Sequence, residues 1–178
     1  MKIPLSWLKD YVQIGLSPEE LAHRLTMAGL EVGATVVIGG KWEDISVGHV
    51  LSVELHPNAD RLTLVTLDTG SDRPTVVCGA PNVAAGQRVA FARPGAKLLD
   101  PDTGHLEVLK AMRIRGVVSE GMICSRRELG VGEDHAGILV LAADAPVGAP
   151  LADYLGDTVL ELEPTTNRPD WLSVLGVA

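Results

Sequence analysis

The stretch KAMRIRGVVSEGMICSRREL, residues 110–129, holds residues whose types and spacing favour contact with a polyanion. Its five basic side chains are Lys110, Arg113, Arg115, Arg126 and Arg127. Arg113 and Arg115 are two residues apart, so on a strand they would share one face at a separation of about 7 Å. Paired cations on an exposed sheet face can follow a nucleic-acid backbone. The alternative is a solvated strand face on which the arginines form salt bridges.

The tetrapeptide SEGM, residues 119–122, lies in the same stretch. Gly121 allows a backbone geometry or a close approach that a Cβ atom would block. Met122 by itself favours a role in filling the core over a role in contacting a ligand.

No residue pattern predicts an active site or a metal site. The sequence lacks a phosphate-cradling G-x-x-x-x-G-K-[ST] loop and a nucleophile elbow, and its five histidines show no ligand spacing. His56, before Pro57, is expected in a loop. Cys78 and Cys124 are expected to be buried, reduced thiols, with a disulfide or a reactive thiol as the alternatives.

Charge and composition set limits on nucleic-acid binding. The 178 residues carry a formal net charge of −8, and residues 39–150 carry 11 lysines and arginines against 14 aspartates and glutamates, a net −3. Residues 43–153 contain one aromatic side chain, Phe91. Any RNA affinity must therefore come from a local patch, with little help from base stacking. No apolar run reaches the roughly 18 residues of a membrane span, and no secretory signal is evident, so no membrane partner is expected. The expected reduced thiols favour a cytosolic protein.

Helical signals dominate the first 38 residues. Ser17 is a candidate N-cap, Pro18 suits the first helical position and Glu20 completes a capping box. Apolar residues follow at helical spacing up to Ala28, and Gly29 is a natural stop. We expect a shorter helix around Pro4–Tyr11 before this one and a strand in TVVIGG, residues 35–40, after it.

From residue 44 the hydrophobic period changes to two, which predicts strands. In ISVGHVLSVEL, residues 45–55, one face should hold Ile45, Val47, Leu51, Val53 and Leu55. Further strands are expected at Leu62–Leu67, Thr75–Cys78, Arg88–Ala92, Leu106–Val118, Gly121–Ser125 and Ile138–Leu141, separated by turn clusters such as HPNAD (residues 56–60) and DPDTG (residues 100–104). Short strands at this regular spacing, separated by turns, predict a small closed β-barrel.

The C-terminal residues return to a mixed pattern. TVLELEPT, residues 158–165, predicts a strand with Leu160 and Leu162 on one face. A helix should begin near Asp170, with Trp171, Leu172 and Leu175 on its apolar face. Because the sequence ends on this face without a cap, we expect a fragment of a longer protein.

Several motifs together resemble a known family. TMAGLEV, HPNADRL, VVCGAPNV, SEGMICS, ELG, DHAGI and NRPDWLSVLGVA, in this order, are similar to the N-terminal part of bacterial phenylalanine–tRNA ligase β subunits, and the resemblance covers essentially the whole chain. The central part resembles the OB-fold tRNA-binding module of some methionine–tRNA ligases and of free-standing tRNA-binding proteins. Trp171 departs from the family, where a smaller residue is usual, so its indole needs its own packing.

The resemblance implies an α+β fold in which a five-stranded OB-fold barrel, residues 39–149, is inserted into a discontinuous α/β domain of residues 1–38 and 150–178. It implies membership of an (αβ)₂ heterotetramer that attaches phenylalanine to its tRNA with ATP and Mg²⁺, with the catalytic site in the α chain. The editing and main anticodon-binding sites lie elsewhere in the β chain. This segment itself should hold no catalytic residue, metal or cofactor.

The motifs also imply candidate tRNA-binding residues. These are Arg113, Arg115, Ser119, Gly121 and Met122, with Arg88 as a weaker addition. The leading hypothesis is a tRNA-associated accessory segment in the cytoplasm, with weak or indirect tRNA contact and no role for DNA. The alternatives are a structural or subunit-interaction module without RNA affinity, and a free-standing tRNA-binding protein.

Overall fold

The computed structural model describes residues 1–100 and 103–178, and these form two compact units. The first unit combines Met1–Ile38 with Gly156–Ala178, and the second is Gly39–Leu155. The first contains β1 (Lys2–Pro4), α1 (Leu5–Lys9), α2 (Pro18–Met27), β2 (Glu31–Ile38), β13 (Asp157–Glu163), the 3₁₀ helix η1 (Pro169–Leu172) and α4 (Val174–Val177).

The second unit is rich in short strands. It contains β3 (Ile45–Leu55), β4 (Thr63–Asp68), β5 (Thr75–Cys78), β6 (Arg88–Ala92), β7 (Lys97–Leu99), β8 (Leu106–Val108), β9 (Met112–Ile114), β10 (Val117–Ser119), β11 (Met122–Ile123), β12 (Val140–Leu141) and α3 (Leu151–Leu155). The turn expected at residues 100–104 includes residues 101–102, which lie outside the described residues.

The first unit is built on a three-stranded antiparallel sheet in the order β1-β13-β2. The strand from the C-terminal part of the chain therefore lies between two strands from its beginning. The alternation predicted for β13 is confirmed, because Leu160 and Leu162 are 0% and 1% exposed. They form a core with Ile3, Leu5, Leu8 and Leu30.

The capping box predicted for the second helix is confirmed. The Ser17 hydroxyl accepts a hydrogen bond from the Glu20 amide at 3.2 Å, and the Glu20 carboxylate accepts one from the Ser17 amide at 3.0 Å. Leu21, Ala22 and Leu25 pack against the core of the first unit. The helix ends before Gly29, whose φ of +98° is accessible to glycine at little energetic cost.

The apolar face predicted for the last helix is partly wrong. Leu172 and Leu175 are 65% and 67% exposed, whereas Trp171, Val174 and Val177 pack against the core. The physical reason is an interruption: η1 ends at Leu172, and Ser173 is extended with φ −134° and ψ 155° before α4 begins. The two short helices therefore bury different faces. A single helix that begins at Asp170 would bury Leu172 and Leu175, which are exposed.

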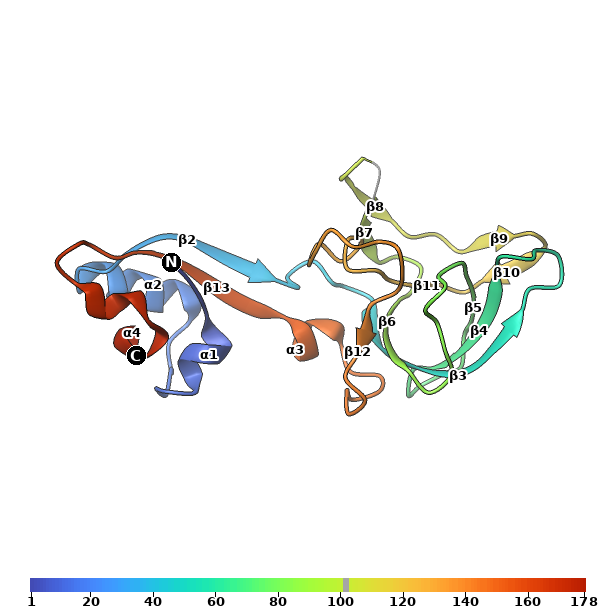
Figure 1. Ribbon diagram of the computed structural model, residues 1–178, viewed down its shortest axis with the longest axis horizontal. Coiled ribbons are helices and arrows are strands. Elements are labelled where there is room, and N and C mark those ends of the chain that lie inside the picture. Colours follow the sequence, from blue (N-terminus) through green and yellow to red (C-terminus); the bar gives the residue numbers. More distant parts are fainter. Residues whose placement is uncertain (101–102) are drawn as a thin grey trace. The chain divides into compact units, whose positions relative to one another are not determined.

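The second unit is a nearly closed, OB-fold-like barrel, in agreement with the closed barrel that the strand pattern predicts and the OB fold that the resemblance implies. Its antiparallel sheet has the order β11-β6-β3-β4-β5, and β12 also pairs with β6 (Figure 1). β3 is long enough to pair with β6 through its first half and with β4 through its second half. Fully buried side chains of the core include Val50, Val65, Leu67, Val76, Val89 and Phe91.

The face predicted for β3 is confirmed at Ile45, Val47 and Val53 and is wrong at Leu51 and Leu55. Val50 is fully buried, whereas Leu51 and Leu55 are 38% and 82% exposed. The register between β3 and β4 shifts between Val50 and Ser52, so one extra residue is accommodated at Leu51. The extra residue shifts the alternation by one position, so Val50 before it and Val53 after it both contact the core, although they are three residues apart.

The position of β13 between β1 and β2 generates a prediction about folding units. Removal of residues 156–178 should abolish hydrogen-exchange protection in α2, because the sheet and core that its apolar stripe contacts would lose their central strand. The barrel strands β3, β4 and β6 should keep their protection, as measured by hydrogen exchange with mass spectrometry. Continued protection of α2 in the truncated chain would show that the two terminal segments do not fold as one domain.

Candidate nucleic-acid interface

The basic stretch forms a hairpin and not the single strand expected at Leu106–Val118. β9 and β10 pair antiparallel with Ile114 opposite Val117, so two residues, Arg115 and Gly116, make the turn. Their φ angles are +49° and +94°, which is the pattern of a type I′ turn. The predicted alternation of Arg113 and Arg115 along one strand face is therefore wrong. Arg113 lies on β9 opposite Val118, and Arg115 lies at the tip of the hairpin.

Arg115 occupies a backbone conformation that arginine seldom adopts. The left-handed region costs an L-residue with a Cβ atom roughly 1–2 kcal/mol. Asparagine, aspartate or glycine normally occupies this turn position. Such an outlier persists only where the surrounding structure holds it.

A second loop holds the turn from outside. Residues 56–60, HPNAD, form what we name the brace loop. Its Asn58 side-chain amide donates a hydrogen bond to the Arg115 carbonyl at 3.0 Å, and His56 Nε2 lies 3.2 Å from the Ile114 carbonyl. His56 Nδ1 accepts the Asn58 backbone N–H at 3.1 Å, so the ring proton lies on Nε2 and is donated to Ile114. His56 lies in a loop, as predicted, but its side chain is only 5% exposed.

The SEGM segment joins the base of the hairpin to the barrel. The Ser119 hydroxyl accepts a hydrogen bond from the Val77 amide at 3.0 Å and donates one to the Gly121 carbonyl at 2.8 Å. The Glu120 carboxylate accepts the Thr75 amide at 2.9 Å, and the Glu120 amide donates to the Thr75 carbonyl at 3.1 Å. Because β5 and β11 are the two ends of the sheet order, these contacts close the barrel between them.

Gly121 is required by close packing. A Cβ atom at this position would lie 2.5 Å from both the Phe91 ring and the Ala92 carbonyl oxygen. Gly121 and Ser119 are both buried, so these two candidates belong to the packing of the barrel. They position the hairpin and present no side chain to the solvent.

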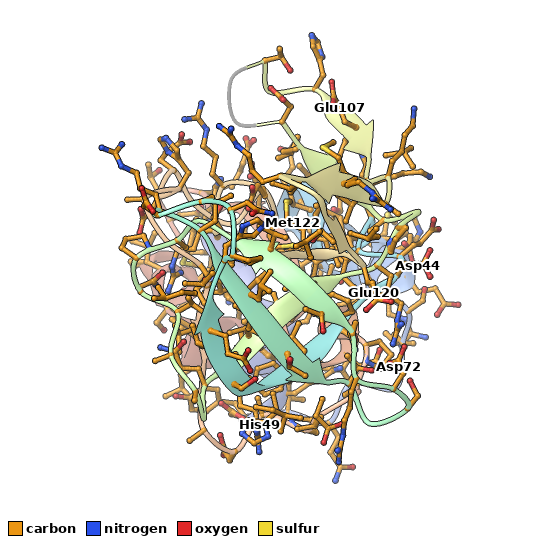
Figure 2. The ribbon with its side chains drawn as sticks, turned by 90° about the vertical axis from the view of Figure 1, so that its right-hand side faces the viewer. Asp44, His49, Asp72, Glu107, Glu120 and Met122 are labelled. Atoms are coloured by element: carbon orange, nitrogen blue, oxygen red, sulfur yellow. The ribbon has the colours of Figure 1, made fainter. Side chains whose placement is uncertain are left out.

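Met122 is half-buried and lies beside a cavity. Figure 2 shows it near the middle of the barrel face, with Glu107 on β8 above it and Glu120 beside it. Met122, Met112 and Val108 contribute to the apolar lining of a cavity of about 340 Å³, and Lys110 and Glu107 contribute charged groups. One wall of this cavity therefore belongs to the basic stretch.

Arg88 does not join the other candidates. It lies at the start of β6, opposite His49 of β3, and Figure 2 shows His49 at the lower end of the barrel. Its Nε and Nη1 atoms are shielded from solvent and have no hydrogen-bond partner among the described residues.

The hairpin arginines form no ion pair with any residue that the structure describes. Within residues 1–100 and 103–178, no salt bridge involves Lys110, Arg113 or Arg115, which are all exposed. By contrast, Arg93 donates to both carboxylate oxygens of Asp72, and this bonding lowers the pKa of Asp72 well below its usual range. The salt bridges of the alternative interpretation are therefore not found in the part of the chain that the structure describes, whereas its solvated face agrees with the exposed side chains.

The two thiols are free and buried, as predicted. Burial raises the pKa of Cys78 and that of Cys124, so neither is a ready thiolate. The described residues include no group of three or more histidine, cysteine or acidic side chains arranged to hold a metal ion. None of their helices has the length and hydropathy needed to cross a bilayer.

Comparisons with known proteins relate this chain to a family and to curated relatives. Residues 45–150 match the family model described as "Putative tRNA binding domain". The whole chain is 53% identical to the phenylalanine–tRNA ligase beta subunit of Dehalococcoides mccartyi and 49% identical to that of Dechloromonas aromatica, and it covers 22% of each. It thus spans about a fifth of the length of these curated relatives. A MetRS-related protein from Pyrococcus horikoshii, known from a crystal structure, is 22% identical over 59% of this chain and 85% of its own, with a TM-score of 0.43.

The closing contacts generate a prediction about stability. Ser119→Ala leaves the Val77 amide without its acceptor, so the free energy of unfolding should fall by about 1–3 kcal/mol in urea denaturation. Ser52→Ala is the matched control, because Ser52 is a half-buried strand residue whose hydroxyl makes no hydrogen bond among the described residues. A Ser119→Ala chain as stable as wild type would show that this hydroxyl does not hold the barrel closed.

The strained turn generates the opposite prediction. Arg115→Asn creates an Asn-Gly sequence, the preferred type I′ turn, and should raise the free energy of unfolding by up to about 1 kcal/mol. Arg113→Asn, on the neighbouring strand, should not raise it. A decrease in stability in Arg115→Asn would mean that the arginine side chain itself stabilises the fold.

Proposed function

The chain belongs to the tRNA-binding domain family and is about half identical to phenylalanine–tRNA ligase beta subunits along its whole length; on that premise, we propose that it is a tRNA-associated accessory segment of such a subunit. The supporting observation is the braced hairpin, which presents Arg113 and Arg115 to solvent without ionic partners among the described residues. These guanidinium groups can pair with backbone phosphates and release condensed counterions.

The contact with tRNA is weak and insensitive to base sequence. The barrel carries one aromatic side chain between residues 43 and 153, and Phe91 is fully buried, so bases have no aromatic platform there. The affinity therefore comes from exposed cations, foremost the hairpin arginines Arg113 and Arg115. We expect a dissociation constant in the non-specific range, roughly 10⁻⁴–10⁻⁶ M at physiological salt.

In the whole enzyme, this segment accompanies the catalytic machinery. We propose that the complete protein joins phenylalanine to its tRNA with ATP and Mg²⁺, as an (αβ)₂ heterotetramer in the cytoplasm. The described residues of this chain do not fit either cofactor, since they hold no cluster of metal ligands and the sequence has no phosphate-cradling loop. We propose that catalysis takes place in the α chain, as the similarity to beta subunits implies.

Subunit interaction is the second candidate function. It is favoured by six large apolar side chains of the first unit that are each 59% or more exposed: Trp7, Tyr11, Met27, Val37, Leu172 and Leu175. Exposed apolar surface of this kind can bind another protein chain. A free-standing tRNA-binding protein is less favoured, because the identity to beta subunits covers all of this chain and not only the barrel.

A salt titration of tRNA binding tests the leading proposal. Replacement of Arg113 and Arg115 by Ala should weaken binding and reduce the slope of log affinity against log salt, by roughly 0.7–0.9 for each phosphate that the protein no longer neutralises. Binding of tRNA to the 178-residue chain can be followed by fluorescence anisotropy at several salt concentrations.

The matched control is Lys41→Ala/Arg73→Ala, which removes the same charge from exposed positions outside the hairpin. It should leave the affinity close to that of wild type. Equally weakened binding in the two double variants would point to net charge and not to the hairpin. A wild-type chain without measurable tRNA affinity would favour the subunit-interaction function.

A further inference from the structure

The β9–β10 hairpin needs support that its own strands do not supply. Each strand has three residues, and together they form a separate two-stranded sheet outside the main barrel order. Met112 and Val118 are 61% and 45% exposed, so the hairpin buries little apolar surface. An isolated two-stranded hairpin is marginal in water. Its turn, moreover, carries the strained Arg115.

The brace loop supplies this support at the tip. Its two side-chain hydrogen bonds reach consecutive carbonyls, those of Ile114 and Arg115, from positions 58 and 57 residues away in the sequence. They leave the arginine side chains untouched, because only main-chain atoms of the hairpin are held. An Asn-Gly turn would adopt the same conformation by its own preference. The chain instead places an arginine at the turn and holds it with a second loop.

From this arrangement we propose that His56 and Asn58 are positioning residues for RNA binding. They hold the hairpin backbone in one conformation, so the strands that carry Arg113 and Arg115 are already ordered when the arginines bind phosphates. The inference rests on the proposed function and adds two residues that do not touch the RNA. Pre-organisation raises affinity because the entropy of ordering the hairpin is lost during folding and not during binding.

A thermodynamic cycle on tRNA affinity tests this role. Asn58→Ala should weaken tRNA binding of the 178-residue chain by roughly two- to tenfold, the worth of one hydrogen bond. In a chain that already carries Arg113→Ala and Arg115→Ala, the same substitution should have no further effect, because residues that act through one another are not additive. A purely structural defect would weaken binding equally in both backgrounds.

Asn82→Ala is the matched control. The Asn82 side chain is also exposed and also donates from Nδ2 to a backbone carbonyl at 3.0 Å, but that carbonyl belongs to Ile138 and not to the hairpin. Asn82 Oδ1 also accepts the Ile138 amide at 2.9 Å, so Asn82→Ala removes one more hydrogen bond than Asn58→Ala and is the more demanding control. The tRNA affinity of the Asn82→Ala variant should equal that of wild type. An equal decrease in affinity in Asn82→Ala and Asn58→Ala would overturn the assignment, as would unchanged binding in Asn58→Ala.

Two substitutions at His56 separate its two hydrogen bonds. His56→Asn keeps an acceptor for the Asn58 amide, as in an Asx-turn, but its side chain is shorter than the reach to Ile114. His56→Gln has a side-chain amide at about the position of Nε2 and should retain the bond to Ile114. We expect His56→Asn to lose affinity like Asn58→Ala and to show faster amide exchange in β9 and β10, and His56→Gln to recover most of both.

The outcomes distinguish this inference from the function on which it rests. If wild type binds tRNA and the brace-loop variants bind equally well, the positioning role is refuted and the proposed function stands. If wild type does not bind tRNA, the proposed function fails, and the RNA role of the brace loop fails with it. Equal affinity and exchange in His56→Asn and His56→Gln would also refute the role of the Ile114 contact.

Discussion

Closure of the barrel depends on two side chains that take the place of a strand ladder. β5 and β11 stand at opposite ends of the sheet order, and the amides of Thr75 and Val77 on β5 would lack partners if no chain paired with them. Glu120 and Ser119 supply those partners through side-chain oxygens, while Gly121 lets the backbone lie against Phe91. The hairpin leaves the barrel directly before this junction. The position of its basic tip therefore depends first on the SEGM contacts and only then on the brace loop.

Local patterns in the sequence were sufficient for most strands. Thr75–Cys78 and Arg88–Ala92 could be predicted to the residue because both are short apolar runs between turn residues. The capping box at Ser17 and Glu20 was equally reliable, since both of its hydrogen bonds join residues three apart. The incorrect predictions lie where a single residue changes which side chains face the core. The bulge at Leu51 in β3 and the break at Ser173 each reverse or reset a periodicity that is counted along the chain.

The candidate interface was less predictable because its contacts are not local. Arg-Gly does not signal a type I′ turn as Asn-Gly does, so residues 106–118 have the appearance of one long strand. The signal for the brace loop was present in HPNAD, but only as a turn; its partners lie 57 and 58 residues further on. Resemblance identified Ser119 and Gly121 as members of a motif. Their part in closing the barrel required the structure.

The placement of β13 has a consequence for synthesis on the ribosome. β1 and β2 are made first, but the strand that pairs with both begins at Asp157, about 120 residues after β2 ends. At roughly 5–20 residues per second, that interval is about 6–24 s. During this time, the nascent barrel can emerge and fold, whereas the apolar stripe of α2 lacks the core that will cover it. Translation speed and chaperone access over this interval therefore bear on the yield of the first unit far more than on that of the barrel.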